Sequence, residues 1–137
     1  MISDNIGNLI VKRLRLEAAI NNMVSGIFLR ASSIKEYPAI LIKLKKREMV
    51  SLYDYECHKN IIEVTTYTLI ETEAIKISEL ILDTLKKINL HQEGQQIQLI
   101  NFRNIISSKV TGSKIWKGKV EIEIIDAKIQ HLTMPNT

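Results

Sequence analysis

The sequence contains few cysteine, proline, glycine and aromatic residues. Its 137 residues include one cysteine, two prolines and five glycines, and aromatic residues make up 5%. The single cysteine, Cys57, cannot form an internal disulfide, which excludes a disulfide-stapled scaffold and is typical of a reducing compartment. No low-complexity tract and no repeat at a fixed period occurs.

Long apolar runs are also missing. The longest, such as residues 39–42, fall far short of the roughly 20 residues that cross a bilayer, so no membrane partner is expected. Residues 1–17 carry an early acid and no cleavable apolar block, which argues against a signal peptide. These features predict a cytoplasmic protein.

The remaining composition is that of a globular protein, with 45% hydrophobic and 25% charged residues. The length suits one core, so we predict a single α+β domain over residues 1–129 and a flexible tail over 130–137. The net charge of +4 is uneven, because basic ends flank an acidic middle at residues 51–100. Alternating solvated faces explain this more economically than a surface for anionic partners.

Hydrophobic spacing predicts two helices and four strands. Apolar residues recur at helical spacing over about 4–24 and 72–90. Apolar and polar residues alternate over four further segments, which we interpret as strands: 39–45, 61–70, 96–105 and 114–127. Residues 27–36 and 107–113 are predicted loops. The order predicts an α+β fold, a four-stranded, mainly antiparallel sheet with two helices packed on one face.

A fifteen-residue connection, 46–60, separates the first two predicted strands. It breaks the alternation without glycine or proline, and connections of this length are typically functional or mobile. It contains four large side chains without a predicted core position: Met49, Leu52, Tyr53 and Tyr55. We predict that they contact a partner protein, and packing back onto their own sheet is the alternative.

Trp116 and Lys117 form a second predicted contact with a partner. For Trp116, simple packing in the core is the alternative. Trp116 also lies within one of two basic runs that together favour a different function, a small basic α+β nucleic-acid-binding module. The runs comprise Lys43, Lys45, Lys46 and Arg47, and Lys114, Lys117 and Lys119. The low aromatic content and the lack of a paired aromatic motif argue against that alternative.

Four residues of types that bind metals or act as nucleophiles lie close together: Asp54, Glu56, Cys57 and His58. Adjacent residues of an extended segment point apart, and no C-x-x-C or H-x-x-x-H pair accompanies them. We interpret them as ordinary loop residues and predict no metal site.

Paired carboxylates and phosphate loops give no catalytic site either. Glu121 and Glu123 share the outward face of one predicted strand, which is typical of solvated or interface charges rather than of two acids in a pocket. Gly112 and Gly118 stand alone, outside any phosphate-binding spacing. We therefore predict no catalytic residues, no cofactor and no enzymatic activity.

A connected pattern over residues 14–129 resembles the tail-completion, or tail-terminator, proteins of long-tailed phages and gene transfer agents. The pattern runs from a helix ending in NMVSGIF (22–28) to the strand YPAILI (37–42) and a long variable loop. It continues with the strand IIEVTTY (61–67), the helix EAIKISELI (73–81) and a closing hairpin ending in KVEIEI (119–124). One departure is Glu71-Thr72, where the turn before the second helix often carries glycine.

The resemblance implies a structural protein without catalytic chemistry. Members of this family form a ring, generally of six copies, which caps the tail tube, stops its polymerisation and joins it to the head connector. The implied partners are further copies of this chain, the major tail-tube protein and the head–tail connector, with nucleic acid only as DNA passing through the ring. The implied location is the host cytoplasm during assembly and then the virion tail.

Overall fold

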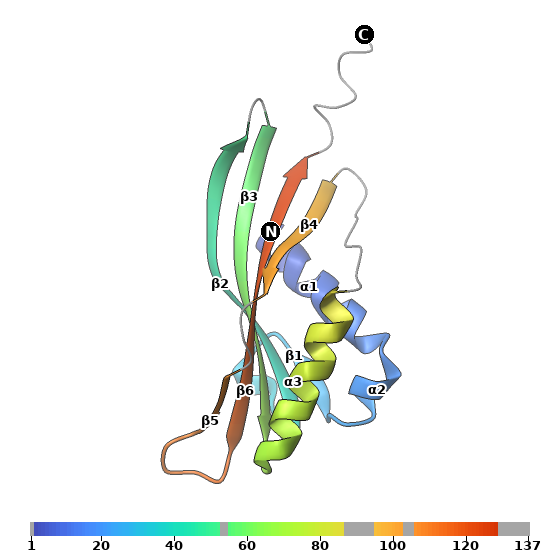
Figure 1. Ribbon diagram of the computed structural model, residues 1–137, viewed down its shortest axis with the longest axis vertical. Helices are drawn as coiled ribbons and strands as arrows, with labels where there is room; N and C mark the ends of the chain where they lie inside the picture. The colour runs from blue at the N-terminus through green and yellow to red at the C-terminus, as the bar shows by residue number, and fades with distance from the viewer. Residues whose placement is uncertain (1, 53–54, 87–94, 103–105, 129–137) are drawn as a thin grey trace.

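The computed structural model describes residues 2–52, 55–86, 95–102 and 106–128. Their main elements are two longer helices and a sheet of long and short strands (Figure 1). The helices are α1 (Ile2–Arg15), α2 (Ala18–Asn21), the 3-10 turn η1 (Ala31–Ser33) and α3 (Glu71–Lys86). The strands are β1 (Gly26–Phe28), β2 (Ala39–Leu52), β3 (Tyr55–Thr68), β4 (Gln95–Phe102), β5 (Ile106–Lys109) and β6 (Trp116–Lys128).

The strands form one mixed sheet that is five strands wide. Its order is β1-β2-β3-β6-β4, and β5 pairs with β6 farther along the same edge as β4. The β1–β2 pair is parallel and the other pairs are antiparallel. Because β6 lies between β3 and β4, α3 connects two strands that are parallel but not adjacent.

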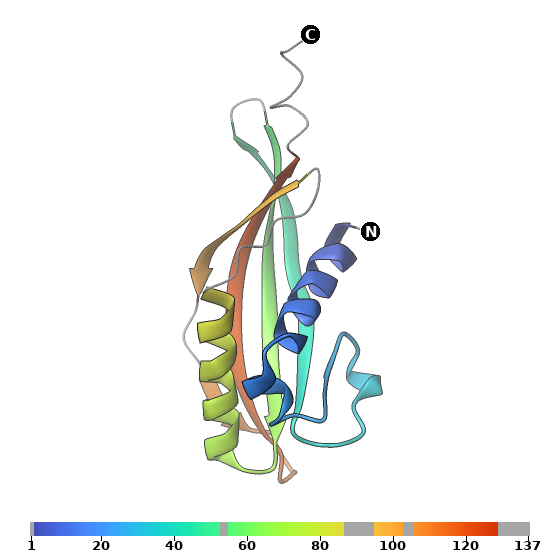
Figure 2. The same ribbon diagram turned by 90° about the vertical axis from the view of Figure 1, so that its right-hand side faces the viewer.

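Both long helices cover the same face of the sheet (Figure 2). The alternation of β2, β3 and β6 turns every second apolar side chain to this face, where it meets the apolar side of each helix. The resulting core contains Ile6, Ile10, Val11, Leu14, Ile20, Ile27, Ile40, Ile42, Ile62, Val64, Ile77, Ile81, Leu85, Val120, Ile122 and Ile124. One apolar cluster therefore joins the helices to the sheet.

A glycine allows α3 to lie close to β6. A Cβ atom at Gly118 would be 2.3 Å from Ser78 Oγ and 2.8 Å from the carbonyl oxygen of Ala74. Real Cβ contacts are essentially never this short, so a larger residue would have to push the helix away from the strand.

The first predicted helix is interrupted after Arg15. The side chain of Asn21 donates hydrogen bonds from Nδ2 to the carbonyl oxygens of Leu14, Arg15 and Glu17 at 2.8–2.9 Å. Leu14 and Arg15 lie in the last turn of α1, whose carbonyls lack the usual α-helical donors, and Glu17 immediately precedes α2. The sequence prediction of one helix over 4–24 is therefore correct in type but misses this break.

The predicted α+β class and the two helices on one face are confirmed, whereas the predicted number of strands is wrong. The structure adds β1 and β5, which lie within or beside the predicted loops 27–36 and 107–113. Strands of three and four residues contain too few alternations to be recognised from periodicity. The predicted helical residues 87–90, strand residues 103–105 and tail residues 130–137 lie outside the described ranges.

The predicted loop at 46–60 is also wrong. β2 continues to Leu52 and β3 begins at Tyr55, so these residues extend a long antiparallel hairpin. A β-bulge between Leu44 and Lys46 shifts the alternation by one residue, which hides the strand pattern in the sequence. The far part of this hairpin, residues 46–52 and 55–59, extends beyond both long helices (Figures 1 and 2) and is called the projecting hairpin below.

Candidate functional site

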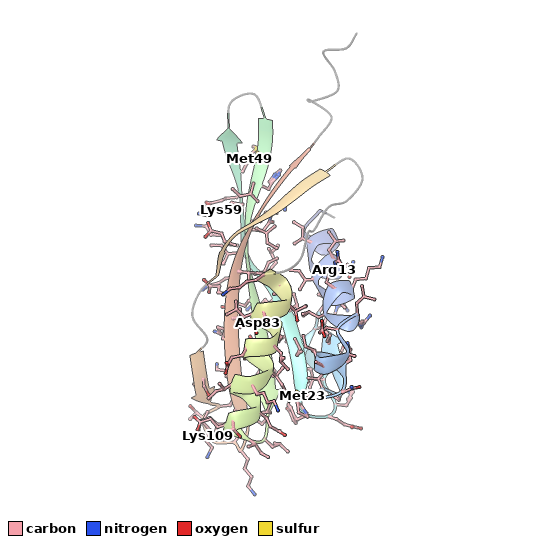
Figure 3. All side chains as sticks on the ribbon, turned by 45° about the vertical axis from the view of Figure 1, so that its right-hand side comes forward. Arg13, Met23, Met49, Lys59, Asp83 and Lys109 are labelled. Carbon is pink, nitrogen blue, oxygen red and sulfur yellow. The ribbon has the colours of Figure 1, made fainter. Side chains whose placement is uncertain are left out.

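The projecting hairpin carries the first group of predicted contact residues. Met49 lies on β2 opposite His58 of β3, and 67% of its surface is exposed. Figure 3 shows Met49 on the hairpin, away from Arg13 of α1 and Asp83 of α3. An exposed thioether on a projecting strand suits a protein contact, because methionine adapts its shape to an apolar partner.

Two other members of that group, Leu52 and Tyr55, lie at the end of the hairpin. Leu52 is the last residue of β2, Tyr55 is the first of β3, and their backbones pair with each other. Tyr53 lies outside the described residues. The structure thus places Met49, Leu52 and Tyr55 on a pair of strands rather than on a long loop.

Trp116 and Lys117 are placed at the other end of the sheet. They begin β6, where Trp116 pairs with Thr68 and Lys117 with Tyr67. The Trp116 ring is half-buried, and Lys109 Nζ lies 5.9 Å from its centroid, within the range of a cation–π contact. Since successive residues of a strand face opposite sides of the sheet, Trp116 and Lys117 do not share one surface.

The two predicted contact groups are far apart. Met49 and Trp116 lie opposite His58 and Thr68, which are ten residues apart on β3, or about 34 Å at about 3.4 Å per residue. Figure 3 shows Met49 and Lys109, the residue beside Trp116, toward opposite ends of the molecule. A single partner surface of ordinary size would not cover both.

The sheet face turned away from the helices, called the outer face, carries ion pairs between strands. Glu63 of β3 and Glu121 of β6 are directly opposite each other. Lys45 Nζ lies 3.0 Å from Glu121 Oε2 and 3.6 Å from Glu63 Oε2, and Lys119 Nζ lies 3.6 Å from Glu63 Oε2. These lysines offset the repulsion between two facing carboxylates.

The pKa values of two residues on this face, Lys45 and Tyr67, differ from their ordinary values. The hydrogen bond that Lys45 donates to Glu121 and the charge of Glu121 raise the pKa of Lys45, with smaller contributions from Glu63, and together they outweigh an opposing effect of burial. The pKa of Tyr67 is also raised, chiefly by burial and additionally by the charges of Glu63 and Tyr37. Both shifts preserve the protonated form to higher pH.

Lysines from both basic runs lie on the outer face, where carboxylates partly neutralise them. Lys45 and Lys119 approach from β2 and β6 toward Glu63 on the strand between them. Lys59 Nζ similarly lies 2.8 Å from Glu123 Oε1. This pairing reduces the positive field available to a polyanion.

The residues considered for metal or thiol chemistry do not form a described site. Cys57 is a buried free thiol on β3, and His58 beside it is half-buried. Across the described residues, no group of three or more histidine, cysteine, aspartate or glutamate side chains could hold a metal ion. Within the same residues, no helix is both long and apolar enough to cross a bilayer.

The sheet has two open edges among the described strands, one along β2 and one along β4. Residues 42–52 of β2 pair with β3 on one side, and β4 pairs with β6 on one side, with no second neighbour for either among the described strands. The pairing places these edges at the same height: Lys46 lies opposite Ile61, Ile61 opposite Glu123, and Glu123 opposite Asn101. Unpaired backbone groups along such edges can accept another strand.

The fold is similar to that of a chain in the solved structure of the virion of a native gene transfer agent particle. The TM-score is 0.68, the sequence identity is 11%, and the match covers 87% of this chain and 91% of that chain. No family model matches the sequence, and no curated protein matches it. The comparison establishes a shared fold over most of both chains.

Proposed function

We propose that this chain is a structural component of a phage-like or gene-transfer-agent particle, and that it acts as the terminator of the tail tube. The observation that carries the proposal is the shared fold with a virion chain over 87% of this sequence. The family resemblance of residues 14–129 supports the finer role. In that role the chain performs no bond chemistry and functions by closing the end of a polymer.

A closed ring needs two unlike, complementary surfaces on each copy. The open edges of β2 and β4 meet this requirement, because they lie on opposite sides of one sheet at one height. Pairing β2 of one copy with β4 of the next would be head-to-tail, and such contacts close into a ring when the rotation permits. A generally sixfold ring would leave no free lateral edge.

The projecting hairpin would then contact the tube or the connector. It extends beyond the helices and exposes Met49, whereas Trp116 lies at the opposite end of the sheet. Two separated contact groups suit a protein that lies between two different partners. We assign Met49, Leu52, Tyr53 and Tyr55 to one axial contact and Trp116 with Lys117 to contacts at the other end.

Tube-length measurements test this function. The major tail-tube protein of the same particle is polymerised with and without this chain, and tube lengths and end-bound rings are recorded by electron microscopy. We expect shorter tubes with a ring at one end. Tubes that keep lengthening in the presence of excess protein would refute the terminator role.

Matched substitutions locate the contact. Met49→Glu should abolish end binding, because a charge would be buried in an apolar contact. Leu16→Glu is the control, since Leu16 is similarly exposed, at 73% against 67%, but follows α1 rather than lying on the hairpin. Equal loss with both variants, or with neither, would contradict the assignment of the hairpin.

The same experiments, together with an oligonucleotide-binding assay, also test the nucleic-acid-binding alternative. A chain that stays monomeric, ignores tube ends and shifts labelled oligonucleotides at moderate salt would support that alternative. The carboxylates paired with Lys45, Lys59 and Lys119 are the reason we favour the structural role.

A further inference from the structure

The β-bulge in β2 lies at the base of the projecting hairpin. Leu44 pairs with Ile62 and Lys46 pairs with Ile61, so Lys45 is an extra residue between two consecutive pairs. Below the bulge, Ile40 and Ile42 are buried in the core under the helices. Since a bulge bends its strand and increases the local twist, its geometry sets the direction in which the hairpin leaves the body.

On the outer face, Lys45 links the bulge to both neighbouring strands. Its Nζ atom lies within 3.0 Å of a Glu121 oxygen on β6 and within 3.6 Å of a Glu63 oxygen on β3. Only 13% and 15% of the two carboxylate side chains are exposed, against 52% for Lys45. The ammonium group therefore covers a pair of facing carboxylates that would otherwise repel each other.

On the opposite face, a second set of contacts links the same three strands. Arg47 of β2 donates from Nη1 to Asn60 Oδ1 at 2.5 Å. Asn60 is fully buried on β3 and donates from Nδ2 to the carbonyl oxygen of Ile124 on β6 at 3.2 Å. These contacts lie just beyond the bulge, where Arg47 and Asn60 are paired in the ladder.

We propose that Lys45 and Asn60 are positioning residues that hold the β-bulge from both faces of the sheet and thereby fix the direction of the projecting hairpin. The term bulge contacts is used for the contacts of Lys45 with Glu63 and Glu121 and of Asn60 with Arg47 and Ile124. Individual exposed ion pairs contribute little, but contacts on both faces of three strands restrict bending in either direction. A hairpin held in one direction loses less conformational entropy when it binds a partner.

Three variants distinguish the effect of the bulge on the hairpin from the effect of the Lys45 ion pairs. Deleting Lys45 joins Leu44 to Lys46 and keeps both of their partners on β3, so the strand becomes regular without a change of register elsewhere. Lys45→Met keeps the bulge and removes the ammonium group. Lys46→Met is the matched control, because Lys46 is adjacent and exposed, and its ammonium group lies 3.6 Å from a carboxylate oxygen of Glu48 on its own strand.

Hydrogen exchange in the full chain measures the effect directly. We expect Lys45→Met to accelerate exchange of backbone amides in residues 46–52 and 55–59 about threefold, and the deletion about tenfold, since less stable local contacts open more often. Lys46→Met should leave these rates within about 1.5-fold of the wild type. If Lys45→Met leaves them as the control does, the positioning role is wrong, and this variant decides the question even if the deletion does not fold.

The link to partner contact rests on the proposed function, and binding to tube ends tests it separately. Lys45→Met should weaken end binding about threefold or more without altering any apolar contact residue. Faster exchange together with unchanged end binding would refute the link. Faster exchange, with a wild-type chain that does not bind tube ends, would refute the terminator role while supporting the bulge contacts.

Discussion

The part of the sheet under α1 and α3, here the covered half, and the part beyond the β-bulge that includes the projecting hairpin, here the projecting half, share the strands β2, β3 and β6. The two halves are stabilised differently. In the covered half, Ile62, Val64 and Ile122 are buried in one apolar cluster with α1 and α3. In the projecting half, Met49 is exposed, and polar contacts of Lys45 and Asn60 connect the strands at its base.

This difference suggests that one half of the sheet determines the stability of the domain and that the other half binds a partner protein. Apolar burial supplies most of the favourable free energy of folding, so the covered half should determine the stability of the whole chain. Among the projecting-hairpin side chains whose burial is described, Cys57 is buried whereas Met49 is exposed, so Met49 is available to a partner. Substitutions in the two halves should accordingly have unequal effects on stability and on assembly.

The largest expected effect is a cavity in the covered half. Ile77 of α3 is fully buried, so Ile77→Ala should lower the free energy of unfolding by about 3 kcal/mol. Met49→Ala should lower it by less than about 0.5 kcal/mol, because the side chain is mostly exposed. Urea denaturation of both variants checks the comparison, which equal losses would overturn.

The next effect tests the close approach of α3 to β6. Gly118→Ala should cost about 2 kcal/mol, because the new methyl group meets Ser78 Oγ and the Ala74 carbonyl. Adding Ser78→Ala removes only the first clash and should recover part of the loss. Thermal denaturation of the single and double variants measures the coupling, and strictly additive losses would mean that the two residues do not meet.

A smaller effect is expected at the boundary between the halves. Asn60→Leu keeps the branched shape of the side chain but removes the hydrogen bonds to Arg47 and Ile124, which should cost about 1.5 kcal/mol. Glu48→Gln, on the exposed side of the same hairpin, is the control and should change stability by less than about 0.5 kcal/mol. A neutral Asn60→Leu in chemical denaturation would mean that these buried bonds add nothing over apolar packing.

The sequence predicts the covered half well, because its periodicity reflects burial on one face. The alternation of Ile62 and Val64, and the helical spacing of Ile77 and Ile81, correctly predict a strand and a helix that share a core. The projecting half defeats the same reasoning. After the bulge at Lys45, polar side chains occur on both faces and the alternation changes phase, so a regular hairpin resembles a loop in the sequence.

The candidate site was predictable only in part. Met49 was correctly predicted to lie outside the core, since it is exposed on the hairpin. Trp116 and Lys117 are neighbours on β6 and therefore face opposite sides of the sheet, and their contact with a partner stays a prediction. Asn60 was missed, because a polar residue gives no local signal of burial, and its partners Arg47 and Ile124 are distant in the sequence.

The smallest expected effect is the dependence of stability on pH that arises from Tyr67 and Lys45 on the outer face of the sheet. Folding raises the pKa of Tyr67 above its ordinary value of 10.0 and that of Lys45 above 10.5. Both groups hold their protons more tightly in the folded chain, so their contributions to stability are complete below about pH 10 and are lost as the pH rises further.

The free energy of unfolding should therefore not vary with pH near neutrality on account of these two groups and should decline above pH 10. Tyr67→Phe retains the ring but cannot ionise, and Lys45→Met removes the ammonium group, so each should make the alkaline decline shallower. Urea titrations between pH 8 and pH 11 measure the slopes, with Lys46→Met as the control for loss of an exposed lysine. If Tyr67→Phe leaves the slope unchanged, burial of Tyr67 and its proximity to Glu63 do not influence its titration in the folded chain.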